Sequence, residues 1–157
     1  MDVKYINPFL EAFTVVMPML GLTDIKKNGI SLKGRNIESN GVMIIVGIIG
    51  DIKGNVIYST SIENAKKIAS TMMMGMPVDE LNELAQSAIS ELTNMLTANA
   101  ATNYSTMNVN INISTPTLMY GEFSANSSAD KVLCVEMLIN GMSFEVNVAL
   151  EKTANML

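Results

Sequence analysis

Two polar side chains three residues apart, Glu91 and Asn94, are the strongest candidates for chemistry in this sequence. Because each residue of an α-helix advances about 100°, they lie side by side on one helical face. Ser87 and Ala98 belong to the same face, at spacings of four residues from Glu91 and Asn94 respectively. No Lys or Arg lies within residues 79–103, so Glu91 has no cationic neighbour one helical turn away. We therefore expect its counter-ion in another element or in another molecule.

A solvated polar face is the simpler explanation of these residues. A Glu-x-x-Asn pair arises by chance in a chain this rich in asparagine, so the pair alone does not define a site. Ser87 one turn earlier favours a functional site, as does the small Ala98, which would leave the helix backbone open to a partner. Spacing alone leaves both interpretations open.

The absence of histidine excludes several common active sites. Ser-His-Asp triads, Cys-His pairs and the usual zinc and non-haem iron sites all need imidazole. The chain also lacks a glycine-rich phosphate-binding loop of either common spacing, and GDIKG at residues 50–54 is typical of a turn between strands. Any chemistry must come from carboxylates, amides, hydroxyls, Lys, Arg or groups that a partner supplies. We expect no metal bound by this chain.

Length and composition indicate one folded domain over residues 1–157. A chain of this size buries roughly 70% of its unfolded surface, and 48% hydrophobic content with 16% charge argues against disorder. The single cysteine, Cys134, lies in an apolar strand pattern, which indicates a buried thiol and no internal disulfide.

Charge and hydropathy limit the partners and the compartment. A net charge of −5 without a basic cluster makes nucleic acid an unsuitable partner. The longest apolar run, Val42–Ile49, is far shorter than the roughly 20 residues that cross a bilayer. The first residues have neither the basic region nor the cleavage site of a secretory leader. We expect a cytoplasmic protein that does not bind membranes.

Hydrophobic periodicity predicts three helices. The first begins at Asn7, with proline at the next position, and ends within residues 18–21. The second follows residues 60–63, TSIE, which have the form of a capping box with Thr60 as the cap. The third spans Asp79–Asn103, with its first residue as the cap. Its predicted core stripe consists of Leu81, Leu84, Ala85, Ala88, Leu92, Met95, Leu96 and Asn99.

Strand patterns lie between and after the helices. Residues 22–40 contain short alternating runs that predict a strand or hairpin, and Val42–Ile49 predicts a strand buried on both faces. The chain turns at GDIKG and returns as a strand over residues 55–59. Residues 107–113 alternate apolar residues with asparagine, as a half-buried strand does, and Pro116 blocks its continuation.

The final hairpin is the clearest local prediction. After residues 121–130, a loop or a weak edge strand, Asn140-Gly141 favours a type I′ turn. In that register Leu133, Val135, Met137 and Ile139 face Val148, Val146, Phe144 and Met142, and all eight share one face. The chain is therefore predicted to be an α+β domain, with helices packed on one face of a mostly antiparallel sheet and a coarse internal repeat of two halves.

These residues resemble a known family. Ser87-x-x-x-Glu91-x-x-Asn94 within a helix, followed by Pro116 just beyond a strand, resembles the signature of the CheC, CheX and FliY phosphatases of bacterial chemotaxis. YINPFLEAF near the start and VGIIGDIKGNVIYS before the second helix agree with it. The single motif helix and the length are most similar to the CheX branch. Two features depart from the family pattern: residues 95–115 form an interval about one residue shorter, and Ala98 stands where glycine is common.

The resemblance implies hydrolysis of the phospho-aspartate on a CheY-like response regulator. The regulator's receiver domain would carry the magnesium ion and a lysine, and Asn94 would orient the attacking water. Glu91 would pair with a cation of the regulator. The partner would contact Ser87, Ala98 and Pro116, and Pro116 would also shape the strand end beneath the helix.

Two other functions remain open from the sequence. Glu91 and Asn94 could serve docking alone, in a non-catalytic module that binds a receiver domain or the flagellar switch. Alternatively, an exposed strand such as residues 107–113 could pair with a second copy in a structural assembly. The resemblance to CheX also implies a homodimer joined through sheet edges.

Overall fold

A computed structural model describes residues 3–153. After a 3₁₀ turn, η1 (Val3–Tyr5), its helices are α1 (Asn7–Met19), α2 (Ile62–Met72) and α3 (Glu83–Ser105). Its strands are β1 (Ile25–Lys33), β2 (Asn36–Glu38), β3 (Val42–Gly50), β4 (Ile52–Thr60), β5 (Ile111–Ile113), β6 (Thr117–Tyr120), β7 (Ser124–Asn126), β8 (Val132–Ile139) and β9 (Met142–Lys152).

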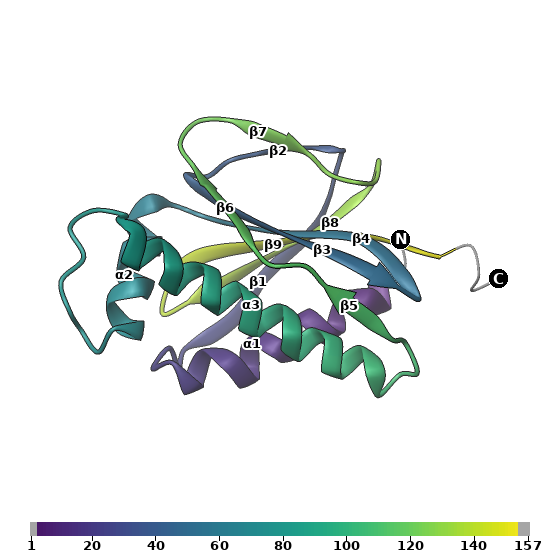
Figure 1. The fold of residues 1–157 in the computed structure, drawn as a ribbon, viewed down its shortest axis with the longest axis horizontal. Helices are drawn as coiled ribbons and strands as arrows, with labels where there is room; N and C mark the ends of the chain where they lie inside the picture. Colours follow the sequence, from purple (N-terminus) through teal and green to yellow (C-terminus); the bar gives the residue numbers. More distant parts are fainter. Residues whose placement is uncertain (1–2, 154–157) are drawn as a thin grey trace.

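A seven-stranded sheet with the order β1-β8-β9-β4-β3-β5 forms the centre of the fold, and β6 also pairs with β3. Its described strand pairs are all antiparallel. Figure 1 shows the three helices on one side of this sheet and the small β2–β7 sheet on the other. The predicted α+β class with helices on one face is confirmed. The coarse internal repeat stays a prediction.

The β8–β9 hairpin is confirmed residue by residue. Asn140 and Gly141 have φ angles of 49° and 79°, as a type I′ turn requires at both central positions. Ile139 pairs with Met142 and Leu133 with Val148, which is the predicted register. The eight apolar side chains of this face all contribute to the main core.

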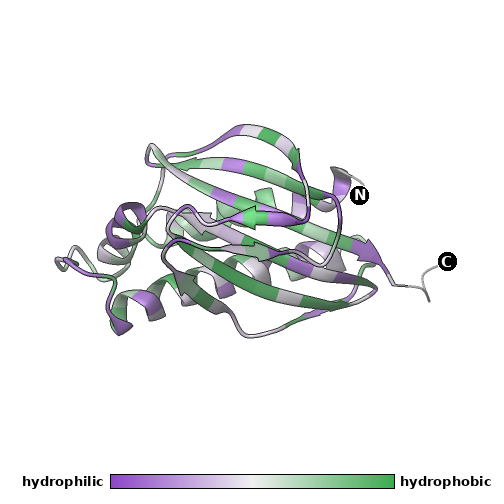
Figure 2. Cartoon of the chain, turned by 90° about the horizontal axis from the view of Figure 1, so that it is seen from above, coloured by the Kyte–Doolittle hydropathy of each residue, from purple (hydrophilic) through white to green (hydrophobic). Residues whose placement is uncertain are grey.

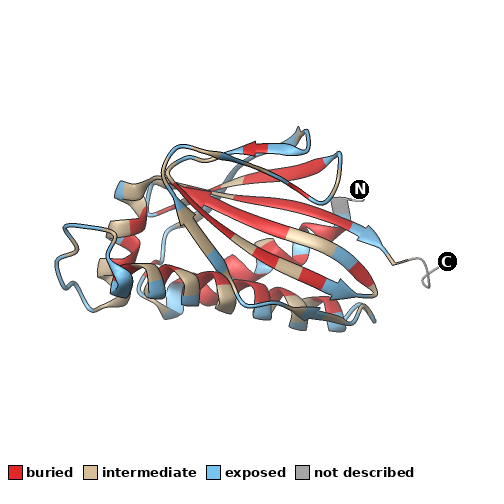
Figure 3. Cartoon of the chain, turned by 45° about the horizontal axis from the view of Figure 1, so that its top comes forward, coloured by how far each residue is buried: buried red, intermediate tan, exposed pale blue. Residues whose placement is uncertain are grey.

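The main core lies between the helices and the sheet. Figure 2 shows hydrophobic residues along the strands, and Figure 3 shows burial concentrated on the central strands and on one side of the helices. A smaller core lies on the opposite face, where the β2–β7 sheet covers part of the large one. Its buried members are Ile37, Met43, Ile57, Val132 and Ala149.

The predicted start of α3 at Asp79 is wrong. The helix begins at Glu83, and the side chain of Asn82 is the cap, accepting a hydrogen bond from the Ala85 amide at 2.9 Å. Asp79 lies in the segment before the helix, where its carbonyl accepts from Lys66 Nζ at 3.2 Å. The Asp79 side chain therefore does not cap α3, and Asn82, the residue directly before the helix, does.

The cap predicted for α2 is also displaced by one residue. Ser61 caps the helix and accepts from the Asn64 amide at 3.0 Å. Thr60 instead ends β4, and its hydroxyl donates to the Ser143 carbonyl at 2.7 Å. Sheet pairing with β9 uses this threonine, so it is not available as a cap.

In α1, Asn7 does not cap the helix. It is the first helical residue, the cap position is Ile6, and no side chain satisfies the first amides. The proline near the helix start, where it loses no intrahelical bond, and the end at Met19 both agree with the prediction.

The core stripe of α3 differs from the predicted stripe. Leu84 is 58% exposed, whereas the threonines at positions 93 and 97 are fully buried. Both hydroxyls donate to carbonyls one turn earlier in the helix, which removes the penalty of burying a polar group. The buried residues are Ala85, Ile89, Leu92, Thr93, Leu96, Thr97, Ala100 and Tyr104.

Several predicted strand boundaries are corrected by long-range pairing. Of residues 107–113, only β5 is a strand, and the edge resumes after Pro116 as β6. The returning strand, predicted over residues 55–59, is the longer β4, and Asp51 alone separates it from β3. Within residues 22–40, β1 and β2 form no hairpin, because β1 pairs with β8 and β2 with β7. β7 lies in the predicted weak edge segment 121–130.

One buried polar contact fixes α3 against the sheet. The Tyr58 hydroxyl of β4 and the Thr97 hydroxyl of α3 are 2.8 Å apart in the fully buried core. Because Thr97 donates its only hydroxyl proton to the Thr93 carbonyl at 2.7 Å, Tyr58 is the donor to Thr97. Burial raises the pKa of Tyr58, so the phenol keeps the proton that it donates.

Replacing either partner should destabilise the fold unequally. Thr97→Val leaves a buried phenol without an acceptor and should lower the free energy of unfolding by about 2 kcal/mol, whereas Tyr58→Phe should lower it by about 1 kcal/mol. The double variant should lose less than Thr97→Val alone, because no unpaired group remains. Urea unfolding of the four proteins measures this, and additive losses would show that the contact contributes nothing.

Candidate functional site

A shallow hollow on the outer side of α3 brings four of the five predicted site residues together. Glu91 and Ser87 are exposed, and Asn94 and Pro116 are half-buried. The fifth, Ala98, is exposed one turn further along the helix and does not line the hollow. The hollow has a volume of about 310 Å³, and its lining residues are Ser87, Ser90, Glu91, Asn94, Thr115 and Pro116.

Glu91 and Asn94 are unoccupied, by which we mean that no other described residue uses their side-chain polar atoms. Within residues 3–153, their side chains make no hydrogen bond or ion pair with another residue. α3 contains no lysine or arginine, so the carboxylate of Glu91 has no counter-ion on its own helix. A carboxylate and an amide are thus presented side by side to solvent, with their hydrogen-bonding capacity free for a partner.

The opposite wall of the hollow is a bulge in the sheet edge. Ile113 of β5 pairs with Ile48 and Thr117 of β6 pairs with Ile45, so residues 114–116 oppose only residues 46–47 of β3. One extra residue in a strand bends it and interrupts the ladder. Proline has no amide proton to give to the ladder, so it is tolerated at such a position. The bulge places Thr115 and Pro116 beside α3.

Ser114 fastens this bulge to β3. The Gly47 amide donates to the Ser114 hydroxyl at 2.8 Å, and the Ser114 amide donates to the Gly47 carbonyl at 2.9 Å. Glycine at position 47 keeps the approach close, since a Cβ there would lie 3.3 Å from the Ser114 hydroxyl oxygen. The sheet therefore determines the position of Thr115 and Pro116 relative to α3, and we call these two residues the proline wall.

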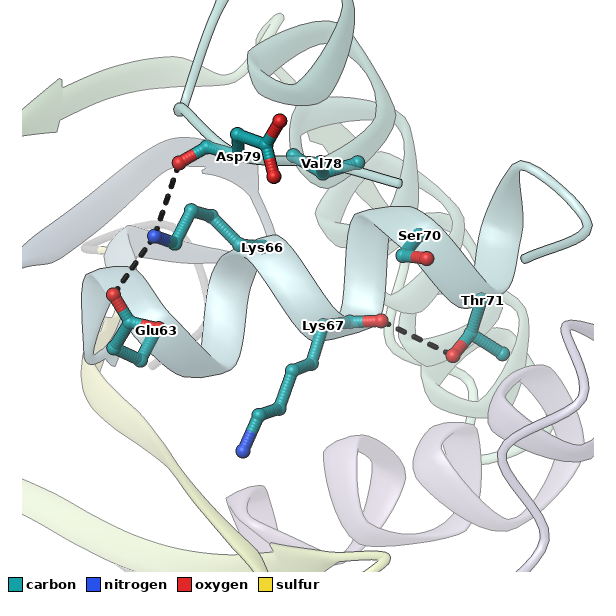
Figure 4. A pocket seen from close by; sticks show the side chains of 7 residues that line it. All are labelled: Glu63, Lys66, Lys67, Ser70, Thr71, Val78 and Asp79. Atoms are coloured by element: carbon teal, nitrogen blue, oxygen red, sulfur yellow. Dashed lines mark hydrogen bonds and ion pairs between the residues drawn. The ribbon is translucent and has the colours of Figure 1, made fainter. Parts of the chain in front are cut away.

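The segment before α3 is held along α2. Ser70 Oγ donates to the Met76 carbonyl at 2.7 Å, and Lys66 Nζ reaches the Asp79 carbonyl at 3.2 Å while pairing with Glu63 at 2.8 Å (Figure 4). The bond from Lys66 lowers the pKa of Glu63. A hollow of about 510 Å³ lies here, but the charge of Lys66 is already neutralised by Glu63. We assign these contacts to the positioning of α3.

Among residues 3–153, no three His, Cys, Asp or Glu side chains form a group that could hold a metal ion. The described helices include none that is both long and apolar enough to cross a membrane.

Sequence reasoning did not identify Ser90 and Thr115 as lining residues. Ser90 directly precedes Glu91 on the helix, and a wider helical-wheel sector would have included it. Thr115 precedes Pro116, but only the pairing of β5 and β6 with β3 brings it to the helix. That pairing joins residues about 70 positions apart, and no local pattern indicates it.

The sequence is similar to known chemotaxis phosphatases. Residues 42–138 match the family model described as chemotaxis phosphatase CheX. The chain is 34% identical over 123 residues to the CheY-P phosphatase CheX of Thermotoga maritima, covering 77% of this chain and 78% of that protein.

Solved structures show the same fold. CheX from Desulfovibrio desulfuricans has a TM-score of 0.85 at 20% identity, covering 95% of this chain and all of that one. The Borrelia burgdorferi CheX-CheY-BeF3-Mg²⁺ complex has a TM-score of 0.78 at 26% identity, with 96% of this chain and all of that chain covered.

Because Glu91 and Asn94 make no hydrogen bond or ion pair with another described residue, their removal should not destabilise the protein. Glu91→Ala and Asn94→Ala should each leave the free energy of unfolding within about 0.5 kcal/mol of the wild type. Urea denaturation measures this, with the buried Thr97→Ala on the same helix as a destabilised control. A loss above about 1 kcal/mol in either variant would show that the side chain has a structural role.

Proposed function

This chain belongs to the CheX family of chemotaxis phosphatases, and we propose that it hydrolyses the phospho-aspartate of a CheY-like response regulator. The observation that carries the proposal is the pair of unoccupied side chains, Glu91 and Asn94, beside the proline wall of the hollow. The 34% identical relative from Thermotoga maritima bears the name of this activity, and the Borrelia burgdorferi relative was solved together with CheY.

Asn94 acts on the attacking water. Its amide both donates and accepts hydrogen bonds, so it fixes a water molecule in line with the phosphorus. Unlike a carboxylate, the neutral amide does not repel the phosphoryl oxygens. The water oxygen bonds to phosphorus, the bond from phosphorus to the aspartate carboxylate oxygen breaks, and inorganic phosphate leaves with both water protons. The regulator's magnesium ion and lysine stabilise the charge that develops.

Glu91 positions the two proteins. Its carboxylate has no cation on its own helix, so a cation of the regulator completes an ion pair across the interface. This pair sets how deeply the neighbouring Asn94 enters the regulator's site. Ser87, Ala98 and Pro116 surround the pair and contact the regulator at the margin. Because receiver domains of this kind act in the cytoplasm, we assign the protein to that compartment.

The sheet offers one long free edge for a homodimer. The β5–β6 edge is short and broken by the bulge, whereas β1 runs over nine residues and pairs on one side only, with β8. Ile30 and Leu32 of β1 are 43% and 69% exposed. We assign the family's homodimer to pairing of two β1 strands, which would join the two sheets and cover these side chains.

Asn94→Ala should abolish the stimulated loss of phosphate while leaving association intact. Loss of one well-placed polar group at such a site lowers the rate by about 10² to 10³. Phosphate release from a regulator charged with acetyl phosphate measures turnover, and titration with the BeF3-loaded regulator measures affinity. If affinity falls together with turnover, Asn94 is an anchor and the water-positioning role is wrong.

Glu91→Ala is the matched comparison on the same helix. It should weaken both turnover and association, and the loss of affinity should shrink at high salt because an ion pair is screened. Unchanged affinity would remove the proposed pair. Binding by the wild type without any phosphate release would instead favour a non-catalytic receiver-binding module.

Leu32→Lys should convert the dimer into a monomer. Each copy would bring a lysine charge into the β1–β1 interface, where the leucine is otherwise covered. Sedimentation velocity at micromolar concentration measures the mass, with Ile49→Lys as a control that adds the same charge at another exposed position. A wild-type monomer, or a dimer that Leu32→Lys leaves intact, would contradict this interface.

A further inference from the structure

Leu84 is an exposed leucine on the same face of α3 as the candidate site. It is the second residue of the helix and is 58% exposed, although the adjacent Ala85 is fully buried. Leu84 precedes Glu91 by seven residues, so the two side chains project within about 20° of each other. A single exposed leucine is common on protein surfaces. Leu84 is distinguished by its alignment with unoccupied polar side chains.

A second hollow joins Leu84 to the site. This hollow has a volume of about 570 Å³ and is lined by Asn82, Glu83, Leu84 and Ser87. Ser87 also lines the hollow that contains Glu91 and Asn94. The two depressions therefore meet at this serine and form one continuous surface along the first three turns of α3.

The distances fit a single partner. At 1.5 Å per residue, Leu84 lies about 15 Å along the helix from Asn94. A typical interface covers about 800 Å² on each protein, which corresponds to a disc with a radius of about 16 Å. An interface of this size is therefore wide enough to cover both Asn94 and Leu84.

The charge of this face indicates what the partner carries. α3 contributes Glu83 and Glu91 and contains no lysine or arginine. A complementary partner surface has a basic group facing each carboxylate and an apolar patch between them that receives the leucine. An apolar side chain flanked by polar groups is a common anchor in protein interfaces, because burying it excludes water from its neighbours.

We infer that Leu84 is the apolar anchor on which the regulator's receiver domain docks, an inference that rests on the proposed function. Leu84 touches no reacting group, since it lies nearly three turns from Asn94. It determines affinity and the choice of regulator, whereas Asn94 determines turnover.

Leu84→Ser tests this role, and Leu84→Met is its conservative counterpart. Leu84→Ser should raise KM for the phosphorylated regulator about ten-fold and leave kcat within two-fold of the wild type. Leu84→Met keeps the apolar volume and should retain the wild-type KM. Serine is well tolerated in the first turn of a helix, so the fold should persist, and urea unfolding checks this.

Ile49→Ser serves as the control, because it removes a similarly exposed apolar side chain from the sheet face opposite the helices. An unchanged KM in Leu84→Ser, or an equal rise in Ile49→Ser, overturns the docking role while Asn94→Ala still tests the phosphatase. If the wild type releases no phosphate, the affinity of the variants for the BeF3-loaded regulator tests the docking role of Leu84 instead. A ten-fold loss in Leu84→Ser then supports the anchor, and no loss or no binding by the wild type overturns it.

Discussion

The rotation of α3 about its own axis is the constraint on which the site depends. The hydrogen bond between Tyr58 and Thr97 is made in a fully buried core, where a polar group left unpaired is costly, so it selects one orientation of the helix. Turning the helix by one residue, about 100°, would break this bond and move Asn94 toward the sheet. A contact made only of apolar side chains would tolerate such slippage more easily. The buried hydrogen bond on one face of α3 thus keeps Glu91 and Asn94 on the opposite, solvent-facing side.

The site is built from two independently anchored parts. α3 supplies the carboxylate and the amide, while the bulge after β5 supplies the proline wall through the two backbone and side-chain bonds between Ser114 and Gly47. Both parts are thus held by contacts within the fold, which suits the proposed presentation of a preformed surface to another molecule's reactive group. In the proposed mechanism, this chain contributes the placement of Glu91 and Asn94.

Turns and helical faces could be predicted from the sequence, because they depend on neighbouring residues. Helix caps and burial that depend on residues far apart in the sequence could not. The β8–β9 hairpin follows from Asn140-Gly141, because those two residues accept positive φ and set the register by themselves. The face of Ser87, Glu91 and Asn94 follows from helical spacing. The cap of α2 was misassigned because Thr60 belongs to β4 and its hydroxyl bonds to the distant Ser143 carbonyl. The cap of α3 was misassigned because the helix begins at Glu83, after Asn82, and not at Asp79. The exposure of Leu84 was missed because two threonines with satisfied hydroxyls, Thr93 and Thr97, lie in the core instead.

The bulge at residues 114–116 also lets the number of residues between β5 and β6 vary without changing how either strand pairs with β3. Because β5 and β6 each pair separately with β3, a residue gained or lost between them alters only the protruding loop, and both strands keep their partners and their inward faces. Homologues whose interval between the motif asparagine and the proline differs by one position can hence present the same proline to the same helix. The interruption of the ladder therefore lets insertions and deletions beside α3 leave the strand pairing unchanged.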